Sequence, residues 1–166
     1  YTLKKRKTMR KRMETLKVYL AGPFFNEEQI AEADKIKDAL LLIKQRGPVA
    51  GLHMYDPRHR LVCEEDANDY TAEYIFQRNL EAIRKSDLVI ANLMDKDQGT
   101  SVEIGYAYAI GKPIVLCWFN TDDRPINLML KPLAVGLAKN ESELAEIIGA
   151  LQYDPYYIKP VKGKIE

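Results

Sequence analysis

Three carboxylates stand close together in the stretch DKDQGTSVEIGYAYAIGKP, residues 95–113: Asp95, Asp97 and Glu103. Neighbouring carboxylates serve either as metal ligands or as the acid and the nucleophile of a displacement reaction. No histidine or further carboxylate stands nearby at a spacing that suits a metal. We therefore predict neither a metal site nor a cofactor, and we treat nucleophilic chemistry as the alternative to a structural role.

The structural role for Glu103 is helix capping. Thr100 to Glu103 reads T-x-x-E, the pattern of a capping box, with Thr100 at the N-cap and Glu103 at N3. Such a cap contributes about 1 kcal/mol to helix stability. The positive end of the helix dipole would also favour the charged form of Glu103. A capping role and a catalytic role are compatible at this position.

The elements around these carboxylates alternate between apolar runs and helical patterns, which predicts an α/β fold. We expect a single-domain, doubly wound, flavodoxin-like parallel sheet of five strands with helices on both faces. The expected strands cover residues 17–21, 49–55, 87–92, 113–119 and 133–138. The expected helices follow Asn26 and cover residues 70–85, the stretch with Glu103, and 141–151.

The expected domain covers residues 17–152, between a basic N-terminal extension at 1–16 and a C-terminal tail at 153–166. The first 17 residues hold eight Lys or Arg, whereas the remainder holds 17 basic and 23 acidic residues. Because this acidic body offers no basic face, we do not expect a nucleic-acid polymer as partner. No apolar run approaches the ~20 residues of a membrane helix, and no signal peptide is evident. We expect a cytoplasmic protein.

In doubly wound sheets, ligands bind at the carboxyl ends of the strands. That rule selects four loops for the site, at residues 22–26, 56–68, 94–100 and 120–129. The first loop carries Gly22, Phe24 and Phe25, but it matches neither G-x-G-x-x-G nor a Walker loop. Two phenylalanines suit the wall of a pocket for a flat ring, and the alternative is that they belong to the core.

Four motifs in order carry a family resemblance: VYLAGPFF at 18–25, NLEAI at 79–83 with Asp87, D-x-G-x-x-x-EIGYA at 97–107, and Asn-Leu-Met at 127–129. Together they resemble the nucleoside 2'-deoxyribosyltransferase family over roughly residues 17–150. The resemblance implies transfer of 2-deoxyribose between nucleobases, with deoxynucleosides and free purine or pyrimidine bases as partners. The position of the family's nucleophile is Glu103. Two inversions through a covalent deoxyribosyl-glutamate would give net retention.

The resemblance also implies roles for other side chains. Tyr19 would orient the glutamate, Asp97 would contact the substrate, and Asn127 would bind the sugar 5'-hydroxyl, in many members from a neighbouring subunit. It implies a homo-oligomer, often a hexamer built from dimers. Small residues near Gly99 leave room for a sugar. The substrate pocket is expected to include Gly22, Phe24, Phe25, Met129 and, by a looser match, Asp56.

Asn79 departs from the family pattern, since many members carry an aspartate there that protonates the departing base. An asparagine donates a hydrogen bond but cannot act as a general acid. The proton then comes from Asp97 or water, or the preference for the base differs. One alternative function is a deoxynucleoside 5'-monophosphate N-glycosidase of the same superfamily. A second is a non-catalytic nucleotide-sensing module on the same fold.

Overall fold

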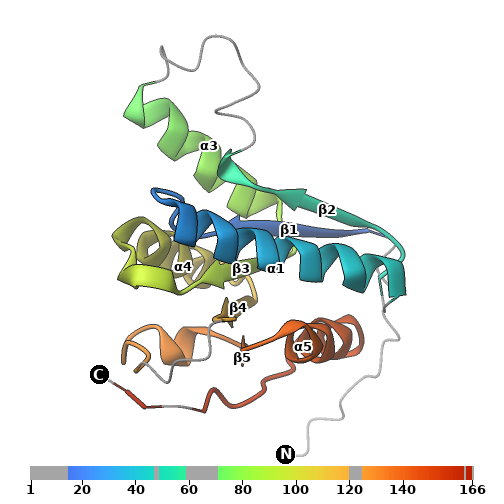
Figure 1. Ribbon diagram of the computed structural model, residues 1–166. Helices are drawn as coiled ribbons and strands as arrows, with labels where there is room; N and C mark the ends of the chain where they lie inside the picture. The colour runs from blue at the N-terminus through green and yellow to red at the C-terminus, as the bar shows by residue number, and fades with distance from the viewer. Residues whose placement is uncertain (1–14, 47–48, 59–70, 120–124, 163, 166) are drawn as a thin grey trace, which may run out of the picture.

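A computed structural model describes residues 15–46, 49–58, 71–119, 125–162 and 164–165. Its centre is a five-stranded, wholly parallel sheet with the strand order β2-β1-β3-β4-β5 (Figure 1). The strands are β1 (Leu16–Ala21), β2 (Leu52–Tyr55), β3 (Leu88–Asn92), β4 (Ile114–Cys117) and β5 (Gly136–Ala138). The predicted fold class is confirmed, and this strand order is the flavodoxin-like one.

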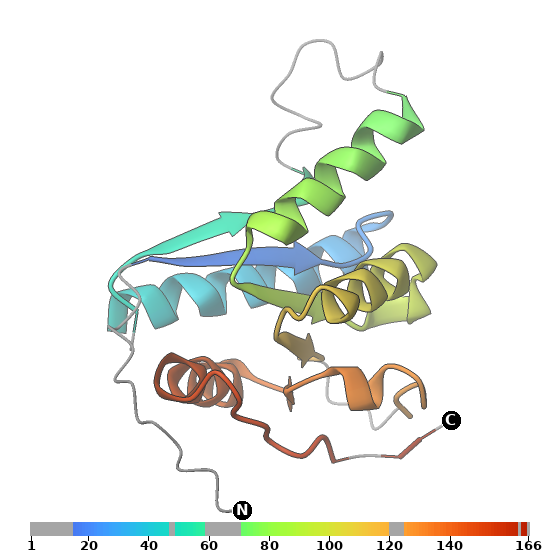
Figure 2. The same cartoon turned by 180° about the vertical axis from the view of Figure 1, so that it is seen from behind.

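Two layers of helices cover the sheet, one on each face (Figures 1 and 2). One layer is formed by α1 (Glu27–Arg46) and α5 (Glu141–Tyr153), the other by α3 (Ala72–Lys85) and α4 (Gln98–Ala109). Two single-turn 3-10 helices, η2 (Met94–Lys96) and η3 (Lys131–Leu133), precede α4 and β5. No helix in the described part of the chain is long and apolar enough to cross a membrane.

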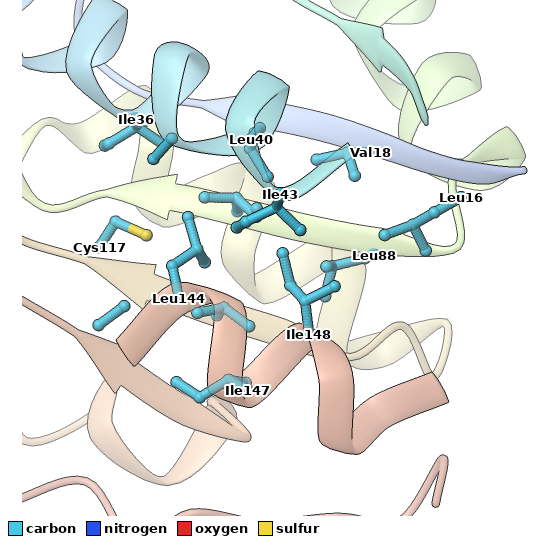
Figure 3. Packing of buried hydrophobic residues seen from close by; sticks show 14 of the residues in the cluster. Leu16, Val18, Ile36, Leu40, Ile43, Leu88, Cys117, Leu144, Ile147 and Ile148 are labelled. Atoms are coloured by element: carbon cyan, nitrogen blue, oxygen red, sulfur yellow. The ribbon is translucent and has the colours of Figure 1, made fainter. Parts of the chain in front are cut away.

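The larger core cluster lies between the sheet and the α1/α5 layer (Figure 3). Ile36, Leu40 and Ile43 recur on one face of α1, and all three are almost completely buried. Opposite them, α5 contributes Leu144 and Ile147 at helical spacing. The strand β3 is buried at all five positions, as expected for a central strand with helices on both faces.

Several predicted elements have different lengths in the structure. The second strand begins at Leu52 rather than at 49, and the fifth covers only residues 136–138 rather than 133–138. Leu133, predicted to start the fifth strand, is instead the last residue of η3, in which Pro132 follows the first helical residue. The basic extension up to residue 14, most of the 56–68 loop and residues 120–124 lie outside the described residues.

Strand order places the functional loops at one edge of the sheet. β1 lies between β2 and β3, so the chain leaves β1 and β3 side by side in opposite directions, which is the topological switch point. Gly22 follows β1 there, and a Cβ at this glycine would lie 3.0 Å from the Cβ of Asn92 at the end of β3. The two loops therefore approach closely only because residue 22 is a glycine.

Two adjacent leucines of α1 test the assignment of its buried face. Leu40 is fully buried and Leu41 is 40% exposed. We expect Leu40→Ala to lower the free energy of unfolding by about 2–5 kcal/mol, because it removes apolar contacts and leaves a cavity. Leu41→Ala is the matched control, and we expect a loss below about 1 kcal/mol in urea titrations. Equal losses for the two variants would contradict the described packing.

Candidate active site

The site is built on one hydrogen bond between a strand and a helix. Tyr19 of β1 has no exposed surface, and its hydroxyl donates to Oε1 of Glu103 on α4 over 2.6 Å. The ring of Tyr19 stacks on Tyr55 of β2 with a centroid distance of 5.5 Å. Burial and the adjacent Glu103 both raise the pKa of Tyr19, so the phenol stays protonated and remains a donor.

The start of α4 differs from the predicted capping box. The N-cap is Asp97, whose carboxylate Oδ2 accepts from the backbone N–H of Thr100 over 2.6 Å and from its hydroxyl over 2.7 Å. The prediction of Thr100 as N-cap was therefore wrong, because Asp97 offers the stronger, charged acceptor three residues earlier. Glu103 is the sixth residue of the helix and takes no part in its cap.

The charge state of Glu103 is set by burial. Desolvation raises the pKa of this carboxyl to about 7, and the negative charge of Asp97 adds to the rise, whereas the hydrogen bond from Tyr19 lowers it. We expected the helix dipole to favour the charged form. That effect falls off within the first helical turn, and Glu103 lies beyond it. The ionised and neutral forms are thus balanced near neutral pH.

Asn79 reaches the same carboxylate oxygen from α3. Its Nδ2 donates to Oε1 of Glu103 over 3.4 Å, at the long end of hydrogen-bond distances. Tyr19 and Asn79 therefore share Oε1 as their acceptor, and none of the described residues donates a hydrogen bond to Oε2. One oxygen of Glu103 is held and the other is open.

A cavity of about 510 Å³ opens beside Glu103, a volume typical of small-molecule sites. Most of the predicted site residues meet there, while Tyr19 supports Glu103 from within the core. The predicted residues that line it are Gly22, Phe24, Phe25, Asn79, Asp97, Gly99 and Glu103. Phe25 is 82% exposed, so it does not belong to the core.

Three predicted residues lie elsewhere. Asn127 and Met129 line a second cavity of about 410 Å³, which shares Asp97 and Thr100 with the first. Asp56 is 5% exposed, and both of its carboxylate oxygens accept from the guanidinium of Arg58. Asp56 thus holds the Arg58 side chain near the pocket and does not itself line the pocket.

Arg58 and Gln29 fix the first loop of the site. Arg58 lies 4.8 Å from the ring centroid of Phe24, which favours a cation–π contact. The side chain of Gln29 accepts from the N–H of Phe25 over 2.7 Å and donates to Asp95 over 3.0 Å. The loop after β1 is therefore tied to the segment that precedes Asp97.

The residues that line the Glu103 cavity but were not predicted include Tyr55, Tyr74 and Arg78. Tyr55 ends β2, so the rule of carboxyl strand ends already pointed to it. Tyr74 and Arg78 are four residues apart on α3, and that spacing places them on the same side of the helix. In the described part of the chain, no group of three His, Cys, Asp or Glu residues is placed to hold a metal.

Comparisons with known proteins identify the family of this chain. The family model for nucleoside 2-deoxyribosyltransferase matches residues 18–145, which include β1, α3 and α4. A nucleoside deoxyribosyltransferase from Limosilactobacillus fermentum is 35% identical over 127 residues, covering 69% of this chain and 73% of that protein. A mouse 5-hydroxymethyl-dUMP N-hydrolase is 29% identical over 94 residues, 57% of this chain and 53% of that protein.

A solved structure extends the similarity to the fold. The 2-deoxyribosyltransferase from Bacillus psychrosaccharolyticus aligns with a TM-score of 0.69 at 27% identity. The alignment covers 87% of this chain and 98% of that one. The resemblance predicted from the four motifs is confirmed at the level of the family.

The raised pKa of Glu103 predicts a pH-dependent cost in stability. Folding raises this pKa from 4.5 to about 7, so the unfolded chain loses its proton first as pH rises. Stability is then lost between about pH 4.5 and 7, by up to about 3 kcal/mol in total. Glu103→Gln removes this titration, so we expect it to stabilise the protein at pH 8 but not at pH 4.

The control is Asp38→Asn on the exposed side of α1. We expect this variant to show the same difference from the wild type at both pH values. Chemical unfolding at pH 4 and pH 8 measures all three proteins. A Glu103→Gln variant that is no more stable than the wild type at pH 8 would contradict the assigned burial of the charge.

Proposed function

Because the chain belongs to the nucleoside 2-deoxyribosyltransferase family, we propose that it exchanges the nucleobase of deoxynucleosides through a covalent deoxyribosyl ester on Glu103. The observation that carries this proposal is the asymmetric environment of the Glu103 carboxylate. Glu103 lines the cavity, its Oε1 is held by Tyr19 and Asn79, and none of the described residues donates a hydrogen bond to Oε2. A nucleophile needs this combination of a fixed position and one free oxygen.

The reaction follows from that arrangement. Oε2 of the ionised Glu103 attacks C1' of the deoxynucleoside, a C–O bond forms, and the C1'–N bond breaks with its electron pair on the base. A second base then attacks C1' from the side the first one left, and the carboxylate is released. Two displacements at one carbon give net retention. Water in place of the second base would give slow hydrolysis.

The sugar is expected at the start of α4. Gly99 leaves space there, since a Cβ at this position would meet only the carboxylate of Asp97. Oδ2 of Asp97 is occupied by Thr100, and we propose that Oδ1 accepts from a sugar hydroxyl. The first turn of α4, about one helical turn from the backbone of Glu103, would thus hold the sugar with its C1' in reach of the Glu103 carboxylate.

We further propose that the protein is a homo-oligomer whose sites are shared between subunits. Asn127 and Met129 do not line the Glu103 cavity of their own chain, and Met129 is 71% exposed. The outer face of α4 also presents Val102 and Tyr108, each more than half exposed. Exposed apolar side chains near a site are typical of an interface.

An N-hydrolase activity on deoxynucleoside 5'-monophosphates is the second candidate. It is favoured by the similarity to the mouse 5-hydroxymethyl-dUMP N-hydrolase, although the chain spans about half of that protein. Incubation of the same deoxyribonucleoside with and without a 5'-phosphate separates the two functions. Release of base from the monophosphate alone, with no transfer to an added base, would replace the transferase by the hydrolase.

The nucleophile is tested directly by trapping the ester. We expect denaturing mass spectrometry of the protein, quenched during turnover without acceptor base, to find one deoxyribosyl group on the peptide with Glu103. Glu103→Gln, which keeps the Tyr19 contact but lacks a nucleophilic oxygen, should lower transfer by at least about 10⁴-fold. A modified peptide elsewhere, or a folded variant with normal turnover, would refute the assignment.

Shared sites predict complementation between two inactive variants. A subunit with Glu103→Gln still supplies Asn127, and a subunit with Asn127→Ala still supplies Glu103. After equal mixing with subunit exchange, about a quarter of the sites combine both intact residues, so we expect roughly that share of wild-type activity to return. Each variant alone is the control. A mixture as inactive as its components would place both residues in one chain.

A further inference from the structure

Among the described residues, the cavity offers no carboxylic acid that is without an assigned role. Of the described residues that line it, only Asp97 and Glu103 carry carboxyl groups. Oδ2 of Asp97 accepts two hydrogen bonds from Thr100, and the proposed function assigns Oδ1 to a sugar hydroxyl. Glu103 must itself be ionised to attack C1'. Neither group is placed to hand a proton to a departing base.

The same cavity is lined by hydrogen-bond donors, and one of them is a cation. Arg78 stands next to Asn79 on α3, and its guanidinium lies 5.6 Å from the ring centroid of Tyr74. No carboxylate in the described part of the chain forms an ion pair with Arg78. The neighbouring Arg84 and Lys85 of the same helix, in contrast, both pair with Glu81.

Arg78 lies in the part of the cavity that suits the base rather than the sugar. The aromatic rings that line the cavity come from the loop after β1, from Tyr55 and from Tyr74, and such rings suit a flat base. The glycine and polar residues at the start of α4 suit the sugar. A base bound against α3 would therefore lie near the guanidinium of Arg78.

We propose that Arg78 is a further catalytic residue, which stabilises the departing nucleobase as an anion in place of a proton donor. This inference rests on the proposed transfer through Glu103. A guanidinium donates several hydrogen bonds in one plane and is never an acceptor, so it matches an edge of carbonyl oxygens and ring nitrogens. The substrates that fit are deoxynucleosides of 6-oxopurines and 2,4-dioxopyrimidines.

The step balances without an acid in the protein. The C1'–N bond breaks, its electron pair stays on the base nitrogen, and the charge spreads to the carbonyl oxygens facing Arg78 and Asn79. The released anion then takes a proton from water. In the second half of the exchange, the incoming base loses its own N–H proton to water as its nitrogen attacks C1'. Bases that leave only when protonated, such as adenine and cytosine, gain least from this arrangement.

A series of leaving groups tests Arg78. The 2'-deoxynucleosides of 5-fluorouracil, uracil and thymine carry bases of falling acidity on one sugar. We expect Arg78→Ala to lower kcat/KM for base release by about 100-fold for deoxyuridine and thymidine, the size of effect seen when one donor to a developing anion is removed. The loss should be smaller for 5-fluorodeoxyuridine, whose base is the better anion.

Two further substitutions and one control complete the experiment. Arg78→Lys keeps the charge and should restore part of the rate, while Arg78→Gln should restore less. Arg84→Ala removes an exposed arginine of the same helix, and we expect normal kinetics from it. In the wild type, deoxyinosine should react faster than deoxyadenosine at neutral pH. An equal loss for all three pyrimidine donors, or a loss confined to donors with a 5'-phosphate, would overturn the proposal.

Failure of this inference is separable from failure of the proposed function. If the ester on Glu103 forms in wild type and in Arg78→Ala at the same rate, Arg78 has no catalytic role and the transferase mechanism stands. If no ester forms with any donor, the transfer mechanism itself is wrong. Deoxyadenosine reacting as fast as deoxyinosine, and faster toward acid, would show that a protein acid protonates the base after all.

Discussion

The hydrogen bond from Tyr19 to Glu103 is the contact on which the site depends. The donor, Tyr19, lies in the core on β1, and the acceptor, Glu103, lies on α4. The two side chains therefore meet only when β1 and β3 are neighbours and α4 packs across them. The close approach at Gly22 and the cap at Asp97 set the same geometry from two other directions. The position of Oε1 of Glu103 therefore depends on the strand order, on the packing of the loop at Gly22 and on the start of α4.

This contact also settles a conflict between burial and charge. A cavity that excludes water strengthens every interaction with the substrate, but it disfavours the ionised nucleophile. The Tyr19 hydroxyl offsets part of that penalty, and the Glu103 pKa of about 7 is the resulting balance. A neutral phenol achieves this without forming an ion pair, which would have neutralised the carboxylate proposed to attack. The raised pKa is thus a consequence of placing the proposed nucleophile in a largely buried position.

Much of this arrangement was predictable from the sequence, because it follows from local patterns. Apolar runs alternating with helical spacing gave the sheet, and the rule of strand ends gave the first loop and the start of α4. The cap was assigned wrongly because T-x-x-E and D-x-x-T overlap at Thr100, and only the structure shows that the Asp97 carboxylate is the acceptor. Arg78 was not predicted because its proposed role depends on which acids and donors line the cavity. Several elements together determine that lining.

The first turn of α4 separates the two cavities, since Asp97 and Thr100 line both. This wall is fixed by two hydrogen bonds between those residues, so a group in the second cavity cannot easily pass to the first. The segment before Asn127 is anchored as well, because the N–H of Ile126 donates to the carbonyl of Lys164 over 2.9 Å. A backbone movement that carried Asn127 past this wall toward Glu103 of its own chain would have to disturb that hydrogen bond. The proposal that Asn127 binds a sugar in a neighbouring copy fits this separation, because neither the wall nor the anchor then has to move.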